Sequence, residues 1–535
     1  MVLNSDSLRR MNEQRPPESQ QISDKDWERT PASAKQLVLD MAQRLAKIEQ
    51  QLVELQAENQ LLREQINRTS NNSSQAPSSD SPKALKPRRK EKSSKKRGGQ
   101  PGHEGHSRSL YAVEQCQSVT EHYPKVCRGC GGELSGEDAN PYRHQIVEMP
   151  PIIPEVKEHR LHQLECQQCG QLTRAELPKE VNPSGYGPRV VATVGVLSGV
   201  YRHSQRMVMS AMQDLFGVSM CLGSVNRLRQ EASMAVAQVV EEAQQYVQQQ
   251  PVVGADESSW SQGNADGANE RGSKAWLWVA VTPLVTYFQV LLSRSTEAAQ
   301  TLLGATFKGI LTSDRYGGYN WVDLERRQLC WAHLKREFIK ISERSGISAQ
   351  LGEALVQQQQ QLFQLWHRVR DGTLARSDFS ESAHQIRTQV KALLQEAADY
   401  EISDREKTPL AKTVRTCRQL LKVEPAMWLF VTVADVEPTN NAAERAIRPA
   451  VLWRRTSFGT QSLAGSHFVA RMLTVVTTLQ SQKRNVLEYM TAAIRANRED
   501  QLGPSLLPEV VNSEDQVLPA HLSSLVCMLD RSRKL

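Results

Sequence analysis

The amino-acid sequence predicts a multi-domain α/β protein whose α/β core is interrupted by an all-helical insertion. Three observations favour this class. Apolar runs with the two-residue period of β-strands begin near residue 250, a heptad repeat lies before residue 68, and two Cys-x-x-Cys pairs lie between these regions. A chain of 535 residues is also too long for one hydrophobic core, so several domains are expected.

Charge is spread unevenly along the chain. The formal net charge is +7, and residues 83–97 hold nine Lys or Arg and one Glu, so the remainder is close to neutral. This distribution indicates a polyanionic partner contacted by one basic segment. No apolar run is long enough to span a membrane, and the N-terminus lacks a signal-peptide pattern. A cytoplasmic location is therefore expected, where cysteines bind metals more often than they form disulfides.

The N-terminal region predicts a dimer. Residues 1–35 are polar and aperiodic, which is typical of disorder. From residue 36 to 68 apolar side chains occupy two heptad positions, which predicts a coiled coil and a homodimer. Asn59 is the one polar residue on this seam and favours a two-stranded parallel register. A single amphipathic helix packed on its own protein is the alternative. The seam residues are Val38, Met41, Leu45, Ile48, Leu52, Leu55, Asn59, Leu62 and Ile66.

A basic linker over residues 69–110 follows the heptads. Its Lys95, Lys96 and Arg97 are predicted to contact the DNA backbone, because clustered cations release counterions from a chain of phosphates. An ordinary solvated linker is the competing interpretation.

Residues 111–180 are predicted to form a zinc-binding domain. Cys127 and Cys130 make one Cys-x-x-Cys turn, Cys166 and Cys169 make the other, and a Gly follows each pair. Two such turns can close a four-sulfur Zn²⁺ site, which stabilises a small domain that has little apolar core. The predicted role of this zinc is structural, because four thiolates leave no open position for a substrate.

Residues 181–245 predict helices joined by a short Gly-containing turn. This pattern fits a helix-turn-helix, in which Asn226, Arg227 and Arg229 would face a DNA groove. An ordinary helical subdomain fits the same pattern equally well.

The strand order beyond residue 250 predicts the fold of the core. Three successive strands, a helix, a fourth strand and a short fifth strand form the order of an RNase H-like fold, in which the first and fourth strands are neighbours. Asp256 and Asp314, which end the first and fourth strands, would therefore lie close together. The predicted elements are strands at 252–256, 275–281 and 286–292, a helix at 296–303, and strands at 309–314 and 329–331.

A third carboxylate follows a helical insertion over residues 341–437. Glu444 is predicted in the first turn of a helix that begins near Asn441. Two other roles for Glu444 are open, namely a capping box with Asn441 and an ion pair with Arg448. Three converging carboxylates can hold two divalent cations, which can cleave and form phosphodiester bonds.

Several motifs together resemble the insertion-sequence-66 family of bacterial DDE transposases over roughly residues 35 to 495. The most specific is Thr-Asn-Asn-Ala-Ala-Glu-Arg-Ala-Ile-Arg-Pro at 439–449; the others are the Lys-Arg-Gly-Gly-Gln-Pro-Gly-His run at 96–103, the cysteine pairs and Cys-Trp-Ala-His at 330–333. The resemblance implies that Asp256, Asp314 and Glu444 form the catalytic, metal-binding triad. It also implies the zinc domain, the helix-turn-helix and the insertion. Ser258 and Arg315 depart from the family pattern.

The activity implied is a DNA transposase that cleaves element ends and joins the 3′-hydroxyl to target DNA with two Mg²⁺ or Mn²⁺ ions. Its partners would be double-stranded DNA, a second copy of the chain and helper proteins, at the nucleoid. Two alternatives are a dimeric DNA-binding regulator with an inactive nuclease fold and a simple nuclease. Candidate phosphate contacts near the scissile bond are Arg445, Arg448, Arg454 and Arg455.

Together these predictions divide the chain into a core in two parts, at 250–340 and 438–500, and a series of flanking regions. The flanking regions are 1–35, 36–68, 69–110, 111–180, 181–245, the insertion 341–437, and a C-terminal tail at 501–535 without a readable motif.

Overall fold

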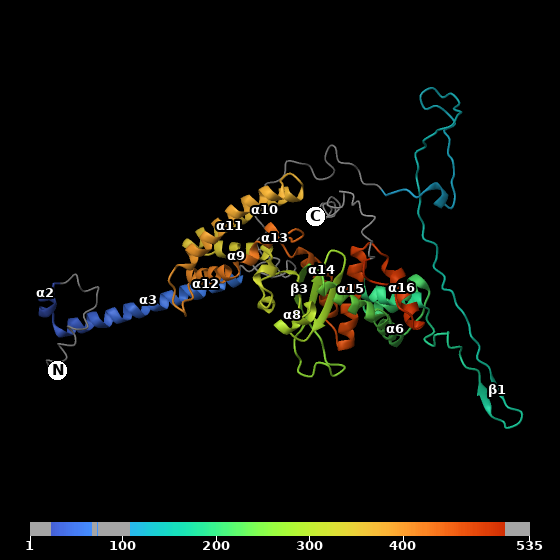
Figure 1. Cartoon of the computed structure of the whole chain (residues 1–535), viewed down its shortest axis with the longest axis horizontal. Helices are drawn as coiled ribbons and strands as arrows, with labels where there is room; N and C mark the ends of the chain where they lie inside the picture. The colour runs from blue at the N-terminus through green and yellow to red at the C-terminus, as the bar shows by residue number, and fades with distance from the viewer. Residues whose placement is uncertain (1–22, 67–71, 73–107, 509–535) are drawn as a thin grey trace.

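The computed structural model describes residues 23–66, 72 and 108–508 (Figure 1). The protein is a mixed α/β structure with one five-stranded sheet and many helices. The predicted DNA-contacting residues Lys95, Lys96 and Arg97 lie outside the described residues. Within the described part, no helix is long and apolar enough to cross a membrane.

The five-stranded sheet has the order β5-β4-β3-β6-β7. The first three strands form antiparallel pairs, whereas β6 pairs parallel with both β3 and β7. The prediction that the first and fourth strands are neighbours is therefore confirmed. The strands are β3 (Val252–Trp260), β4 (Ala275–Val281), β5 (Thr286–Leu291), β6 (Ile310–Ser313) and β7 (Arg327–Leu329).

Helices from both ends of the core region pack with this sheet. Helix α14 contacts β3 and β4, α15 contacts β5, and α16 packs on α4 and α6. Strand β4 is buried along nearly its whole length, which explains its unbroken apolar sequence. The helices are α4 (Pro188–Gly199), α5 (Gln205–Phe216), α6 (Leu222–Ala235), α7 (Ala237–Gln248), α8 (Thr296–Leu303), α14 (Asn441–Ser457), α15 (Leu463–Ser481) and α16 (Val486–Arg498).

One apolar core joins the α4–α7 helices to the sheet. Val191 of α4, Leu228 of α6, Trp278 of β4 and Met472 of α15 all belong to it. The backbone of α4 also approaches α15 closely, since a Cβ at Gly199 would lie 2.8 Å from the Met472 side chain. The helical region and the sheet are therefore packed as a single unit.

The all-helical insertion has a core of its own. Trp331, Phe338, Trp366 and Phe430 are buried in it and stack edge to face, which suits aromatic rings. Gly352 lets two helices touch, because a Cβ there would lie 2.2 Å from the backbone nitrogen of Ser342. The helices are α9 (Trp331–Ser342), α10 (Ile347–Arg370), α11 (Arg376–Ala398), α12 (Pro409–Lys422) and α13 (Leu429–Thr432).

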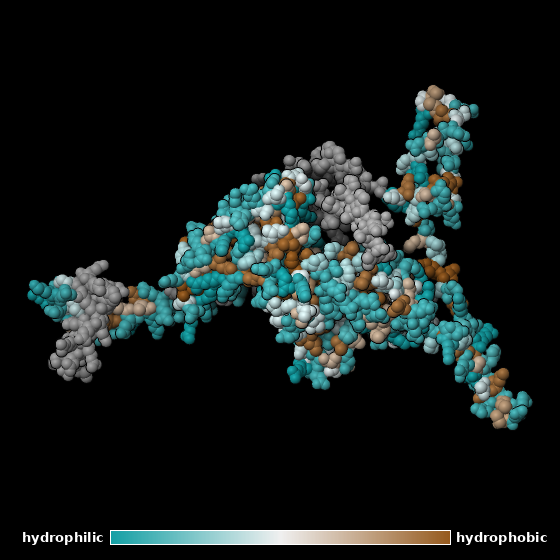
Figure 2. Space-filling view, in the orientation of Figure 1, coloured by the Kyte–Doolittle hydropathy of each residue, from teal (hydrophilic) through white to brown (hydrophobic). Residues whose placement is uncertain are grey.

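Residues 108–181 form an extended arm that has almost no buried side chains. Its regular structure is one 3-10 turn (Val113–Gln115) and the pair β1 (Gln163–Glu165) and β2 (Leu172–Arg174). Figure 2 shows apolar residues exposed along the arm; Ile146 is 86% exposed and Ile153 is 85% exposed. Burial of apolar surface therefore contributes little to the stability of this arm.

Two helices precede the arm. Helix α2 (Asp24–Arg29) is short and places Trp27 in a buried position, whereas α3 (Ala32–Ile66) is a single helix of 35 residues. Most apolar residues of the heptad seam are exposed on α3, including Leu52 at 53% and Leu55 at 57%.

Candidate active site

The parallel pairing of β3 and β6 places Asp256 beside Asp314. Gly254 is paired with Thr312, so Asp256 and Asp314 lie two residues further along the two strands at the same level. Both are half-buried, and each is oriented by a backbone N–H. Asp256 Oδ1 accepts from Glu257 N at 2.9 Å, and Asp314 Oδ1 accepts from Tyr316 N at 2.9 Å.

Asn440 fixes the start of α14 against β3. Its side-chain Nδ2 donates to the Ala255 carbonyl at 2.7 Å, and its backbone N–H donates to Cys330 Sγ at 3.1 Å. Gly254 makes this approach possible, because a Cβ there would lie 2.9 Å from Asn440 Oδ1. Glu444, in the first turn of α14, is thereby brought near Asp256, which lies in the middle of β3 rather than at its end as predicted.

The charges of three neighbouring carboxylates act on Asp256, although the carboxylate oxygens of Asp256, Asp314 and Glu444 do not all lie within 4.8 Å of one another. Burial raises the pKa of Asp256 well above its usual value, and the negative charges of Glu257, Asp314 and Glu444 raise it further. These four residues, Asp256, Glu257, Asp314 and Glu444, are called the acidic cluster below. Its arrangement favours either a proton on Asp256 or a bound cation beside it.

Glu257 is the member of the cluster with its own partners. Its side chain is 1% exposed and accepts from Arg294 Nε at 2.9 Å and Nη2 at 2.6 Å, and from the Tyr319 hydroxyl at 2.6 Å. Burial and Asp314 raise the pKa of Glu257, whereas the Tyr319 and Arg294 bonds lower it. The negative charge of Glu257 is therefore neutralised within the protein. Sequence reasoning did not place Glu257 among the site residues.

Two further side chains, Cys330 and His333, contact Glu444. Glu444 Oε1 lies 3.9 Å from Cys330 Sγ and 3.5 Å from His333 Nδ1. Burial raises the pKa of the Cys330 thiol to about 11, and burial lowers the pKa of His333 although Glu444 and Asp314 oppose that effect. Neither residue was predicted as a site residue, although the Cys-Trp-Ala-His motif that contains them was part of the family resemblance.

The capping box of Asn441 and Glu444, one of the two alternative roles for Glu444, does not form at α14. The N-cap residue is Asn440 rather than Asn441, and no side chain bonds to the exposed N–H groups of this helix start. The Glu444 carboxylate instead faces Cys330 and His333.

The four arginines of α14 have different environments. Arg445, Arg448 and Arg455 are exposed. Arg454 is half-buried and bonds to β3, donating to Ser258 Oγ at 3.1 Å and to Ser259 Oγ at 2.7 Å. Arg454 therefore anchors the helix to the strand.

The predicted recognition helix corresponds to α6. Two of its three candidate DNA-contacting residues are exposed, and the third packs inside the protein. Asn226 and Arg227 are exposed, and Arg227 donates to the Ser184 carbonyl at 3.1 Å. Arg229 instead stacks on the Phe468 ring, 4.4 Å from its centroid, and burial lowers its pKa. The expectation that Arg229 faces a groove needs correction, because α6 turns this residue toward α15.

The two cysteine pairs form matching turns. In the first turn, Cys127 N donates to Gly132 O at 2.8 Å, and Gly131 N donates to Cys127 O at 2.9 Å. In the second turn, Cys166 N donates to Gln171 O at 2.9 Å, and Gly170 N donates to Cys166 O at 2.8 Å. N–H groups near each first sulfur lower the pKa of Cys127 and Cys166, as a metal-binding thiolate requires.

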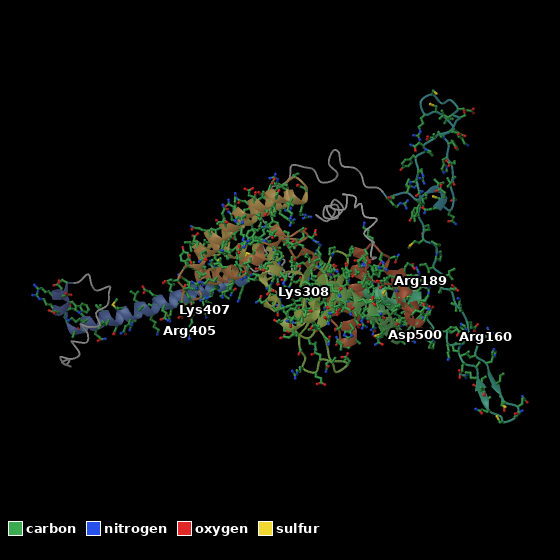
Figure 3. All side chains as sticks on the ribbon, in the orientation of Figure 1. Arg160, Arg189, Lys308, Arg405, Lys407 and Asp500 are labelled. Carbon is green, nitrogen blue, oxygen red and sulfur yellow. The ribbon has the colours of Figure 1, made fainter. Side chains whose placement is uncertain are left out.

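These turns lie apart on the arm. The second turn joins β1 to β2 at the far end of the arm (Figure 1), and Arg160, labelled in Figure 3, lies just before it. Among the described residues, the only group of three or more metal-binding side chains within 4.8 Å of one another is Cys330, His333 and Glu444. The structure therefore does not bring the four cysteine sulfurs into one group.

Comparison with known families identifies the class of protein. The model described as "zinc-finger binding domain of transposase IS66" matches residues 124–170, which include all four cysteines of the two turns. The arm therefore matches the zinc-finger domain of a class of transposases. The model described as "Transposase IS66 family" matches residues 186–467, more than half of the chain, and the protein belongs to this family. A family of unknown function matches residues 14–109.

Two similar proteins come from Sinorhizobium fredii. "Uncharacterized protein y4qI" is 28% identical over 235 residues, which cover 40% of this chain and 41% of that protein. "Uncharacterized protein y4hP" is 23% identical over 393 residues, which cover 66% of this chain and 67% of that protein.

Proposed function

We propose that this transposase cleaves the ends of its element and joins the freed 3′-hydroxyl to target DNA, with Asp256, Asp314 and Glu444 as the catalytic carboxylates. One observation carries the proposal. The neighbouring strands β3 and β6 carry Asp256 and Asp314, and α14, which begins far along the chain, carries Glu444. The charges of Asp314 and Glu444 both act on Asp256.

The sheet supports this proposal at the level of the fold. Three antiparallel strands followed by two parallel ones, in the order β5-β4-β3-β6-β7, fit an RNase H-like core. In such a core the two neighbouring strands β3 and β6 carry the first two acidic residues; here Asp256 lies in the middle of β3 and Asp314 directly follows β6. A separate helical insertion between β7 and α14 is compatible with that assignment, because it leaves the sheet uninterrupted.

The donor set fits two divalent cations such as Mg²⁺ or Mn²⁺. Carboxylate oxygens are the ligands that these hard cations prefer. Burial raises the pKa of Asp256, and the neighbouring carboxylates raise it further, which supports a bound cation beside it. When bound, the ions would activate the attacking oxygen and stabilise the leaving 3′ oxygen. Asp256 and Asp314 would hold both ions, and Glu444 would complete one position. Arg294 offsets part of the Glu257 charge, which also acts on Asp256.

Other regions would bind the DNA. Arg445, Arg448 and Arg455 are exposed on the helix that carries Glu444, so they are placed to contact phosphates beside the scissile bond. Asn226 and Arg227 of α6 are the remaining candidates for contacts in a groove. A zinc ion that joined the two cysteine turns would fold the arm for recognition of the element ends.

A strand-joining assay tests the proposed function. The purified protein, a labelled DNA fragment ending in the element's terminal sequence, a supercoiled plasmid and Mg²⁺ are incubated together. We expect labelled plasmid, which requires both cleavage and joining. Cleaved fragment without joined product would indicate a nuclease, and DNA binding without cleavage would indicate a non-enzymatic regulator.

The exposed seam of α3 favours a homodimer. Leu45, Ile48, Leu52 and Leu55 are each about half exposed or more, and they recur at heptad spacing along one side of the helix. Pairing two such helices in a parallel coiled coil would bury this surface, and Asn59 would set the register.

Replacing Leu45 and Leu52 together by Glu is expected to convert the dimer to a monomer, because four like charges would face one another across the seam. Sedimentation velocity would measure the change in mass. Gln51→Glu, at an exposed position off the seam, is the matched control and should remain dimeric. A double variant that stays dimeric would show that α3 does not form the interface.

A further inference from the structure

Three different metal-binding side chains meet where α9 and α14 begin. Cys330 Sγ lies 3.9 Å from Glu444 Oε1, His333 Nδ1 lies 3.5 Å from the same oxygen, and one ligand atom from each residue lies within 4.8 Å of the others. Cys330 is 1% exposed and His333 is half-buried. The cluster supplies sulfur and nitrogen donors that the aspartates of the acidic cluster lack.

The local fold holds these side chains in place. Cys330 is the N-cap of α9 and His333 is its third residue, so both project from the first turn of one helix. Two backbone bonds tie that turn to the segment before α14: Trp331 N donates to Pro438 O at 2.9 Å, and Asn440 N donates to Cys330 Sγ at 3.1 Å. The positive dipole end of α14 favours the Glu444 carboxylate at this point. Burial raises the pKa of the Cys330 thiol to about 11, so a zinc ion would have to displace the thiol proton.

The two distances from Glu444 Oε1 are close to those of a tetrahedral zinc site, and the Cys330 and His333 ligand atoms lie within 4.8 Å of each other. With ordinary Zn–S, Zn–N and Zn–O bonds, neighbouring ligand atoms lie roughly 3.3 to 3.5 Å apart. The observed 3.5 and 3.9 Å need adjustments of a few tenths of an ångström. His333 Nδ1 is buried and makes no hydrogen bond, whereas its Nε2 lies 3.3 Å from Arg336 Nη1. Arginine can only donate, so Nε2 accepts from Arg336 in the metal-free protein. A zinc ion on Nδ1 would place the ring proton on Nε2 and would require Arg336 to turn away from it.

We propose that Cys330, His333 and Glu444 bind a Zn²⁺ ion that is distinct from both the zinc of the cysteine turns and the Mg²⁺ or Mn²⁺ of the acidic cluster. Thiolate and imidazole donors select Zn²⁺, whereas all-carboxylate sites select Mg²⁺ or Mn²⁺, so the two neighbouring sites separate the two kinds of ion. The zinc would engage Glu444 through Oε1, which leaves its other oxygen for the acidic cluster. Zinc binding itself does not depend on the proposed catalysis.

The zinc content of the full-length protein tests this proposal. The protein is equilibrated with Zn²⁺, excess Mg²⁺ and a weak chelator, then desalted and measured by elemental mass spectrometry. We expect about two zinc ions per chain, one from the cysteine turns and one from the new site. Cys330→Ser and His333→Asn should each retain about one ion, and so should a chain with Cys127→Ser and Cys166→Ser.

Matched controls remove the same side chains elsewhere. Cys417→Ser removes another buried thiol and His367→Asn removes another histidine, both in the helical insertion, and both variants should keep two ions. If Cys330→Ser fails to fold, the zinc content of His333→Asn decides whether the site exists, because His333 is only half-buried. Circular dichroism verifies that this variant is folded. A wild-type chain holding only the zinc of the cysteine turns, or a His333→Asn chain holding two ions, would overturn the site. Failure of strand joining with two ions bound would refute only the proposed activity.

Discussion

Replacing Asp256 by Asn is expected to lower the rate of DNA strand cleavage by about a thousandfold or more. The variant keeps the size of the side chain but loses the charge that would bind the divalent ions. Those ions would stabilise the transition state by several kcal/mol. Because about 1.4 kcal/mol corresponds to a tenfold change in rate, their loss accounts for the expected decrease. Single-turnover cleavage of an element-end fragment in Mg²⁺ measures the rate. Binding of the same fragment, followed by fluorescence anisotropy, should be unchanged.

A stability measurement separates loss of metal binding from loss of fold. Burial and neighbouring carboxylates raise the pKa of Asp256, so its charged form destabilises the metal-free folded state. Without divalent ions, Asp256→Asn should therefore melt at a higher temperature than the wild type. Asp435→Asn, which changes an exposed carboxylate before α14, is the control and should keep full activity. An active Asp256→Asn enzyme, or an inactive Asp435→Asn enzyme, would refute the assigned triad.

Removing the zinc of the arm is expected to unfold residues 111–175 and to weaken binding of the element ends. The arm has almost no buried side chains, so little apart from a bound metal can order it. Cys127→Ser should lose the zinc of the cysteine turns and should make the arm sensitive to limited proteolysis, while residues 186–467 stay resistant. Loss of affinity for the element ends should accompany the proteolysis.

Cys116→Ser is the matched control, because Cys116 lies on the same arm but outside the two turns. This variant should keep its zinc, its protease resistance and its DNA affinity. Unchanged DNA binding by Cys127→Ser after complete loss of that zinc would separate the arm from recognition of the element ends.

The sheet could be predicted from the sequence because its strands carry a clear period. Residues 275–281 and 296–303 were predicted with the bounds that β4 and α8 have in the structure. The pairing of β3 with β6 followed from strand order alone, and it accounts for two of the three acidic residues. Glu444 was placed by its motif, since nothing in the spacing of residues 314 and 444 relates them.

The remaining features depend on contacts between distant segments. Arg229 and Arg454 resemble exposed cations in the sequence, but Phe468 and Ser259 each lie far along the chain and draw them inward. Cys330 and His333 lie beside Glu444 because the segment before α14 approaches the start of α9, where Asn440 N donates to Cys330 Sγ. The shared core of α4–α7 and the sheet likewise comes from α15 and α16, which no local pattern could link to them.

The hydrogen bond from Trp331 N to Pro438 O joins the start of α9 to the segment just before α14. The insertion is also held on β7, because Gln328 Nε2 donates to Met427 O at 3.1 Å and Phe430 N donates to Gln328 Oε1 at 2.9 Å. Loops of the insertion that lie away from these contacts can therefore change in length without shifting Glu444.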